Sequence, residues 1–365
     1  MESSGHDDQI IIMPVSRIKR LAVRLLTNPM VLWGIEQTTR GTASILTLHR
    51  FAAYGRPGHD PESLARNLEW LRRRRYHVVS LMDLITRVRR EDRNPRGTVV
   101  FTVDDGYADF AEVAAPVFAR YDCPVTVFLI TGFLDGGLWL WWDRVRYALD
   151  HTPHRSLAFP LPERTIQYSW NDPASLLRTC RDLINRLKVL PNEEREAAHR
   201  EIEARLEVEL PRSPPAEFGP MTWDQVRALS GNGVSFGPHT VTHPILARTT
   251  DEQSRQEIQG SWQRLKEQVP DPVPVFCWPN GDPTSFGPRE VRYAAQAGML
   301  AGLSTVQAPL TRRQWESNGG AFAVPRYAYP QQADDFAQVV SGLERLKAIA
   351  RTDLFSGRNG GTTKP

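Results

Sequence analysis

Residues 98–107 read Thr-Val-Val-Phe-Thr-Val-Asp-Asp-Gly-Tyr, a continuous apolar run that ends in two acids and a glycine. The length and the β-branched residues of 98–103 predict a buried strand. Carboxylates directly after such a strand are costly beside a core, so Asp104 and Asp105 indicate a bound cation, divided acid and base roles, or strong hydrogen bonding. An Asp-Asp-Gly turn that only caps the following helix explains the same residues equally well.

Short apolar runs alternate with amphipathic helical patterns on both sides of this stretch. Asp60-Pro61 predicts a helix start, with aspartate as N-cap and proline at the first helical position. We expect the other strands at 44–49, 77–81, 125–130, 234–236, 274–278, 300–304 and 321–326. About seven strands separated by helices indicate an α/β fold with a parallel sheet that is closed or nearly closed.

One long segment interrupts the alternation. Residues from about 134 to 216 hold a tryptophan-rich patch and two helical patterns, and they end in a proline-rich stretch. We predict a helical insertion within one catalytic unit that spans 44–330. Residues 1–43 are expected to form an N-terminal helical segment, and residues 331–365 a C-terminal helix with a flexible tail.

Composition limits the choice of partner and compartment. The net charge is only +3, which makes no case for nucleic-acid binding, and the three scattered cysteines suit reduced thiols. We read no signal peptide and no transmembrane span, so we expect a cytoplasmic location. Residues 16–33 mix arginine and lysine with apolar residues and are suited to contact with an anionic membrane surface, although a helix packed on the domain is the favoured alternative. The sequence indicates no oligomeric state.

A second polar constellation is His239-Thr-Val-Thr-His243. Two histidines four residues apart can share one metal ion, and the prolines on either side place them on a loop or a single turn. Such a pair alone is more often structural. Together with one of the two aspartates it gives three ligands and leaves coordination sites open, which is the layout of a catalytic metal site. The remaining aspartate then suits the role of base.

A third stretch, Phe276-Cys-Trp-Pro-Asn-Gly281, places proline and glycine around a strand end. Such a turn can direct a backbone N–H at a developing oxyanion, although an ordinary strand-to-helix loop accounts for it as well. His49, Asp104, Asp105 and His239 likewise lie at or just after the ends of predicted strands. In parallel barrels that face carries the chemistry.

The motifs Thr-Val-Asp-Asp-Gly-Tyr, His-Thr-Val-Thr-His and Trp-Pro-Asn-Gly resemble, in this order, three motifs of the polysaccharide deacetylases, also called the NodB homology domain or carbohydrate esterase family 4. The resemblance spans about 44–326 apart from the insertion. It implies a distorted (β/α)7-like barrel of parallel strands and an acetylated amino-sugar glycan as substrate. It further implies Asp104 as general base, the backbone N–H of Asn280 as oxyanion donor, and Asp105, His239 and His243 as metal ligands. Zinc suits these ligand types, and cobalt or nickel also would.

Two departures concern proton transfer. Cys277 stands where the family often has an arginine that orients the base, and no histidine follows His243 to act as general acid. Leu46-Thr-Leu-His-Arg50 resembles the early histidine-bearing strand of the poly-N-acetylglucosamine deacetylases, in which that histidine is the acid. We therefore assign this role to His49, with a strand-end histidine bonded in the core as the alternative.

The residues leave two rival functions open. One is a hydrolase of a small cyclic amide or imide on the same scaffold. The other is an inactive metal-containing glycan-binding module, because the late histidine and the motif arginine are missing. The tryptophans are either sugar-stacking surfaces or core residues: Trp139, Trp141, Trp142 and Trp278.

Overall fold

The computed structural model describes residues 28–37, 40–53, 55–160 and 164–346. At its centre lies β3 (Thr98–Val103), the strand predicted from the Asp-Asp stretch, with all of its residues buried. It pairs in parallel with β1 (Thr42–Leu48) and with β4 (Val125–Leu129), and β4 pairs in parallel with β7 (Val234–Pro238). Parallel strands covered on both faces need apolar residues on both sides, which explains the continuous apolar runs.

The next two strands continue the ring beyond β7. β8 (Val275–Cys277) and β9 (Ala301–Leu303) pair in parallel with each other. The backbone N–H of Val273, just before β8, donates to the carbonyl of Phe236 in β7 at 2.7 Å. One backbone hydrogen bond therefore connects the two sheets.

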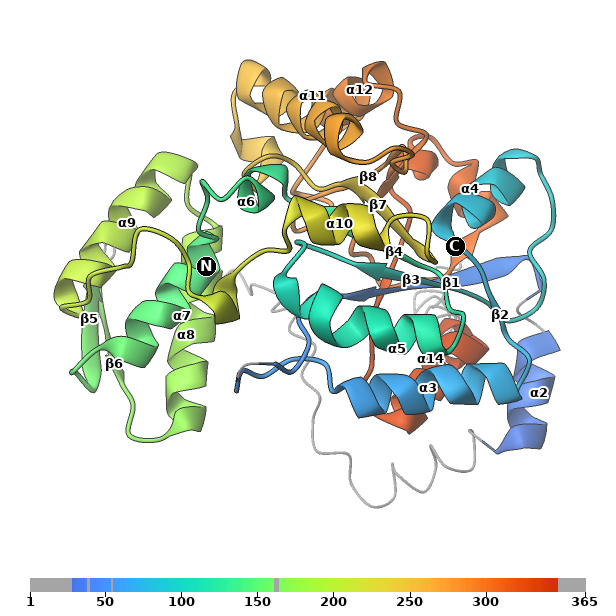
Figure 1. The fold of residues 1–365 in the computed structure, drawn as a ribbon, viewed down its shortest axis with the longest axis horizontal. Helices are drawn as coiled ribbons and strands as arrows, with labels where there is room; N and C mark the ends of the chain where they lie inside the picture. Colours follow the sequence, from blue (N-terminus) through green and yellow to red (C-terminus); the bar gives the residue numbers. More distant parts are fainter. Residues whose placement is uncertain (1–27, 38–39, 54, 161–163, 347–365) are drawn as a thin grey trace, which may run out of the picture.

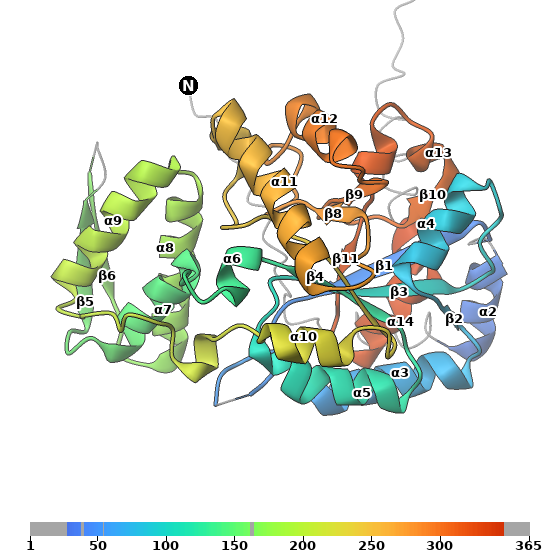
Figure 2. The same ribbon diagram turned by 45° about the horizontal axis from the view of Figure 1, so that its top comes forward.

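The ring is completed between β9 and β1. Leu303 forms a parallel bridge with Val324, and β11 (Tyr327–Ala328), which follows, pairs in parallel with β1. The strands thus follow chain order around a nearly closed, distorted barrel with helices outside it (Figure 1, Figure 2). The predicted (β/α)7-like fold is confirmed. Two short strands lie off this ring: β2 (His77–Val78), parallel to β3, and β10 (Leu310–Thr311), antiparallel to β1.

Helices between the strands cover the barrel. In Figure 1, α3, α5 and α14 lie on one side of the sheet and α11 and α12 on the other. The predicted start of α3 is confirmed, since the Asp60 side chain accepts the backbone N–H groups of Glu62 and Ser63. The helices outside the insertion are α2 (Pro29–Gln37), α3 (Pro61–Arg73), α4 (Leu81–Arg89), α5 (Ala115–Arg120), α6 (Thr131–Leu134), α10 (Trp223–Leu229), α11 (Asp251–Gln268), α12 (Pro288–Gln296), α13 (Arg312–Trp315) and α14 (Ala333–Ser341).

The two ends of the chain differ in part from expectation. A strand was predicted at 321–326, but a 3₁₀ turn at Gly320–Phe322 occupies the start of that range. The strand in this part of the chain is β11, which follows directly after that range. Residues 1–27 and 347–365 lie outside the described part, including most of 16–33. In α2, Leu32 is buried, whereas Met30 and Trp33 are exposed. Membrane contact there stays a prediction, and among the described residues no helix has the length and hydropathy to cross a bilayer.

The insertion forms a lobe beside the barrel, at the left of Figures 1 and 2. Its helices are α7 (Trp141–His151), α8 (Pro173–Lys188) and α9 (Asn192–Arg205). The insertion also contains an element that the sequence analysis did not predict, an antiparallel hairpin of β5 (Ser156–Pro160) and β6 (Thr165–Ser169). Leu157 and Phe159 alternate with exposed or half-buried neighbours and enter the core of the lobe, a period of two that favours a strand.

The buried His199 of α9 makes the lobe sensitive to acid. Burial, followed by the charges of Arg144 and Arg195, lowers the pKa of His199 to about 3. Below the unfolded pKa of about 6.5 the unfolded chain binds a proton that the folded chain does not. We therefore expect this histidine to reduce the free energy of unfolding as pH falls from about 6.5 towards 3, by roughly 1.4 kcal/mol per pH unit.

Urea unfolding at pH 7 and pH 5 measures this effect. In the variant His199→Leu the free energy of unfolding is expected to depend less steeply on pH than in the wild type. The difference corresponds to one proton bound on unfolding, because all other titratable groups are common to both proteins. Identical slopes in the two proteins would mean that His199 is protonated in the folded state.

Candidate active site

Most of the polar residues predicted at the strand ends line one cavity of about 390 Å³. His49 follows β1, Asp104 and Asp105 follow β3, and His239 follows β7. The loop after β8 contributes Trp278 and Asn280, and His243 completes the set of predicted residues. The cavity therefore lies at the carboxyl end of the barrel, where the sequence placed the chemistry.

Four residues at or beside this cavity have left-handed backbone. Asp105, Thr240, His243 and Asn280 have φ values of 76°, 68°, 59° and 60°. Such conformations are costly for residues other than glycine and persist where the surrounding structure enforces them. Gly106 has a φ of 87°, and a Cβ atom there would lie 2.7 Å from the side chain of Leu129, so glycine is required beside the carboxylates.

Asp105, His239 and His243 form one buried group. Nε2 of His239 lies 3.6 Å and Nε2 of His243 lies 3.8 Å from Oδ1 of Asp105. Atoms that are each about 2.1 Å from one tetrahedral ion lie roughly 3.4 Å apart, so these separations suit a shared ion. The structure thus brings together the three predicted ligands.

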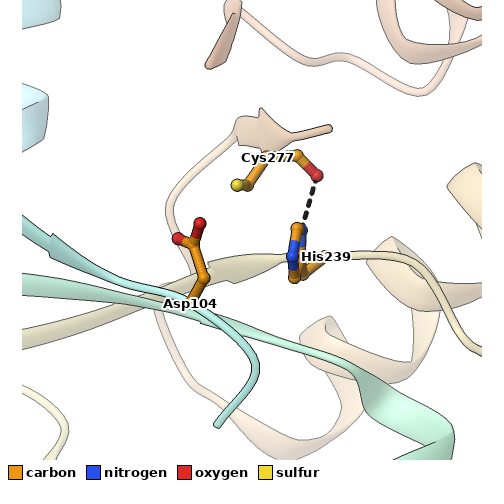
Figure 3. Close-up of side chains that lie close together, drawn as sticks. All are labelled: Asp104, His239 and Cys277. Carbon is orange, nitrogen blue, oxygen red and sulfur yellow. Dashed lines mark hydrogen bonds between the residues drawn. The ribbon is translucent and has the colours of Figure 1, made fainter. Parts of the chain in front are cut away.

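Contacts other than those with Asp105 orient the imidazole rings of His239 and His243. Nδ1 of His239 donates to the carbonyl oxygen of Cys277 at 2.7 Å (Figure 3). Its Nε2 therefore keeps a free lone pair, and this atom lies 3.6 Å from Oδ1 of Asp105. The ring of His243 packs edge to face against Trp142, with centroids 4.8 Å apart. Its backbone N–H donates to Oγ1 of Thr240 at 2.9 Å.

The electrostatics of the three ligands favour a bound cation. Burial, and then the charge of Asp104, raise the pKa of Asp105 well above its usual range. Burial lowers the pKa of His239 to about 4, and it lowers the pKa of His243 well below its usual value. A divalent ion would stabilise the ionised carboxylate and use the neutral imidazoles as ligands, so the residues fit a metal such as zinc.

A second possible ligand group shares His239 but does not fit an ion. Asp104, His239 and Cys277 have ligand atoms within 4.8 Å of one another (Figure 3). The guanidinium of Arg326 donates to both oxygens of Asp104 at 2.8 Å and to Sγ of Cys277 at 3.2 Å. Burial raises the pKa of the Cys277 thiol well above its usual value. A protein cation already bonds to these atoms, and the thiol is protonated.

Arg326 is the functional residue that the sequence analysis missed. It is fully buried just before β11, and it also donates to the carbonyl of Ser304 and to Oγ1 of Thr102. Burial alone would raise the pKa of Asp104, but the charge of Arg326 outweighs it and lowers the pKa below the usual range. Arg326 and Cys277, which stands where the resemblance led us to expect an arginine, therefore lie in contact beside Asp104. The sequence feature that could have identified it is the single arginine within the otherwise apolar segment 321–328.

His49 and Asn280 flank this centre. Nε2 of His49 lies 3.8 Å from Oδ2 of Asp104, and its side chain is 51% exposed at the rim of the cavity. The carbonyl of Asn280 accepts from Oγ1 of Thr305 at 2.8 Å, which holds the turn. Among the described residues no group accepts a hydrogen bond from the backbone N–H of Asn280.

The insertion supplies one wall of the cavity. Its lining residues are Trp141, Trp142, Asp143, Ile184, Asn185 and Lys188. Tyr107 connects this wall to the barrel, since its hydroxyl donates to Asp143 at 2.7 Å and accepts from Nε1 of Trp142 at 2.8 Å. Trp139 does not line the cavity and packs against Tyr147 and Phe218. The sequence analysis named Trp141 and Trp142 as sugar-stacking candidates, and both line the cavity, but it did not predict the other insertion residues there.

Comparison with known proteins agrees with this geometry. The family model for polysaccharide deacetylase matches residues 91–155 and 194–302, and the gap between the two segments falls inside the insertion. No curated protein sequence matches the chain.

Two solved structures share the fold. A Streptococcus pyogenes deacetylase, PplD, in complex with acetate is 16% identical, with a TM-score of 0.55, over 82% of this chain and 98% of that one. A Bacillus cereus polysaccharide deacetylase is 12% identical, with a TM-score of 0.50, over 82% of this chain and 69% of that one. With the motifs at the strand ends, the match of the family model shows that this chain is similar to the polysaccharide deacetylases.

Proposed function

We propose that the protein is a metal-dependent hydrolase that removes N-acetyl groups from amino sugars of the N-acetylglucosamine type in a polysaccharide, an oligosaccharide or a lipid-linked glycan. The observation that carries the proposal is the buried Asp105–His239–His243 group beside the ion pair of Asp104 and Arg326. The first group suits a divalent ion, and the second provides an ionised carboxylate next to it. The match to the polysaccharide deacetylase family model supports the reaction class.

The proposed roles follow from the contacts. Asp105, His239 and His243 would hold a divalent ion, which would supply Lewis acidity to the acetamide carbonyl and to water. Asp104 accepts the proton of the attacking water, because Arg326 keeps its carboxylate ionised and bonded in one orientation.

Two further groups act on the tetrahedral intermediate. The backbone N–H of Asn280, which has no acceptor among the described residues, donates to the oxyanion. His49 protonates the leaving amine, and its position at the cavity rim lets it exchange protons with solvent between turnovers. The products are acetate and a free amino sugar.

Replacing His49 tests its assignment as the acid. We expect His49→Gln to lower kcat by about a hundredfold, the usual contribution of a general acid, without changing the bound metal. His77 is exposed and is not among the residues that line the cavity, so it provides the control His77→Gln. Full kcat in His49→Gln would transfer the acid role to another group.

A substrate panel tests the function as a whole. Purified protein with one equivalent of zinc is expected to release acetate from N-acetylglucosamine oligomers and to leave cyclic amides and imides intact. Turnover of a ring amide alone would support the cyclic-amide hydrolase instead. Bound metal without turnover of any substrate would support the inactive glycan-binding module.

A further inference from the structure

One buried carboxylate in the cavity has no role in the mechanism above. Asp143, in the first turn of α7, is only 6% exposed and lines the same cavity as the metal-ligand group. Its Oδ2 accepts the hydroxyl of Tyr107, and among the described residues its Oδ1 accepts no hydrogen bond. Oδ1 is not one of the fully buried polar atoms that lack a partner, so it is open to the cavity and can accept a hydrogen bond from a molecule there.

No cation of the described chain is bonded to Asp143. The cation whose charge acts most on Asp143 is Arg50, whose guanidinium lies over the Tyr107 ring at 3.9 Å from the centroid. Arg50 instead donates to Oδ2 of Asp109 at 2.5 Å and to the carbonyl of Glu217 at 2.6 Å. Its charge therefore acts on Asp143 only from a distance, and Oδ1 stays available to a molecule in the cavity.

The residues around Asp143 indicate which chemical groups a molecule bound in the cavity would present. Trp141 and Trp142 precede it in α7 and also line the cavity, and the hydrogen bond to Tyr107 fixes the Trp142 indole. A carboxylate accepts hydroxyl donors, and an indole packs against the apolar face of a ring. A sugar ring presents both features at once. An anionic group at the same place would be repelled.

We propose that Asp143 accepts hydrogen bonds from hydroxyl groups of the acetylated sugar in the cavity, so that α7 of the insertion selects an uncharged hydroxylated ring. The proposal rests on the proposed N-deacetylase function. It assigns to the insertion a direct part in substrate recognition, next to the metal-ligand group but outside it.

Asp143→Asn is the informative variant, because the amide keeps the shape and can still accept from Tyr107. We expect KM for N-acetylglucosamine oligomers to rise about ten- to hundredfold, the usual effect of losing a hydrogen bond to a charged group, with a much smaller change in kcat. Asp150→Asn removes a carboxylate from the same helix outside the cavity lining and serves as the matched control.

A purely structural role of Asp143, such as stabilising the start of α7, predicts a lower unfolding temperature with an unchanged KM, and that outcome overturns the proposal. A second measurement uses only the wild type and a series of monodeoxy analogues of the substrate. At least one missing hydroxyl is expected to raise KM tenfold or more in the wild type. Equal KM values for all analogues would also overturn the proposal.

The two proposals fail in different ways. If the wild type releases no acetate from any acetylated sugar, the deacetylase function itself is wrong. If the wild type is active and Asp143→Asn keeps the wild-type KM, only the role of Asp143 is wrong.

Discussion

Asp104→Asn is expected to lower kcat for acetate release by about a hundred- to ten-thousandfold, the range that a general base contributes. The amide fills the same space but cannot accept the proton of water. Asp104 is not among the three proposed ligands, so we expect the metal content to stay at the wild-type value. Parallel measurement of bound metal and acetate release checks both statements.

The partly exposed Asp135 pairs with Arg264 away from the cavity, and Asp135→Asn is the matched control. Its kcat is expected to equal that of the wild type. Loss of metal from Asp104→Asn would instead mean that Asp104 is a ligand, and Asp105 would then be the candidate base.

The second large effect concerns Arg326. Its fully buried guanidinium forms two 2.8 Å hydrogen bonds with the buried carboxylate of Asp104. Arg326→Met leaves that carboxylate without its cation, and removing one partner of a buried pair costs about 3–5 kcal/mol of unfolding free energy. We also expect kcat to fall by at least about tenfold, because the base loses its orientation.

A double-mutant cycle checks this coupling by urea unfolding. The cycle combines Arg326→Met with Asp104→Asn. The double variant is expected to lose less unfolding free energy than the two single variants lose together, because no uncompensated charge remains in it. Additive effects would contradict a direct pairing of the two residues. Arg326→Lys keeps the charge but not the two-pronged contact, so its kcat is expected to lie between those of the wild type and Arg326→Met.

The sequence was sufficient where the chemistry lies in short motifs at strand ends. Asp105 follows a strand whose residues are all apolar or threonine, and His239 and His243 lie on one loop. Because parallel strands of a barrel end at the same face, local patterns predicted that these side chains meet. The hairpin of the insertion was missed because its strands alternate more and less buried residues, whereas the barrel strands were predicted from continuous apolar runs.

Contacts between distant parts of the chain were not predictable in this way. Arg326 meets Asp104 across 222 positions, and nothing near Asp104 in the sequence identifies the arginine as its partner. Asp143 likewise reaches the cavity only because the insertion folds back onto the barrel and Tyr107 bonds to it. Neither pair of residues is separated by a characteristic number of positions in the sequence. Each contact therefore depends on how whole helices and strands pack against one another.

The most direct test of the central claim is a metal titration of the stripped protein. After removal of metal by a chelator, acetate release from N-acetylglucosamine oligomers is measured as zinc is added. We predict no activity without metal and a linear rise that reaches its plateau at one ion per chain, with no rise in the His243→Ala variant. Full activity in the stripped wild type, or the same titration curve in His243→Ala, would contradict a catalytic metal held by Asp105, His239 and His243.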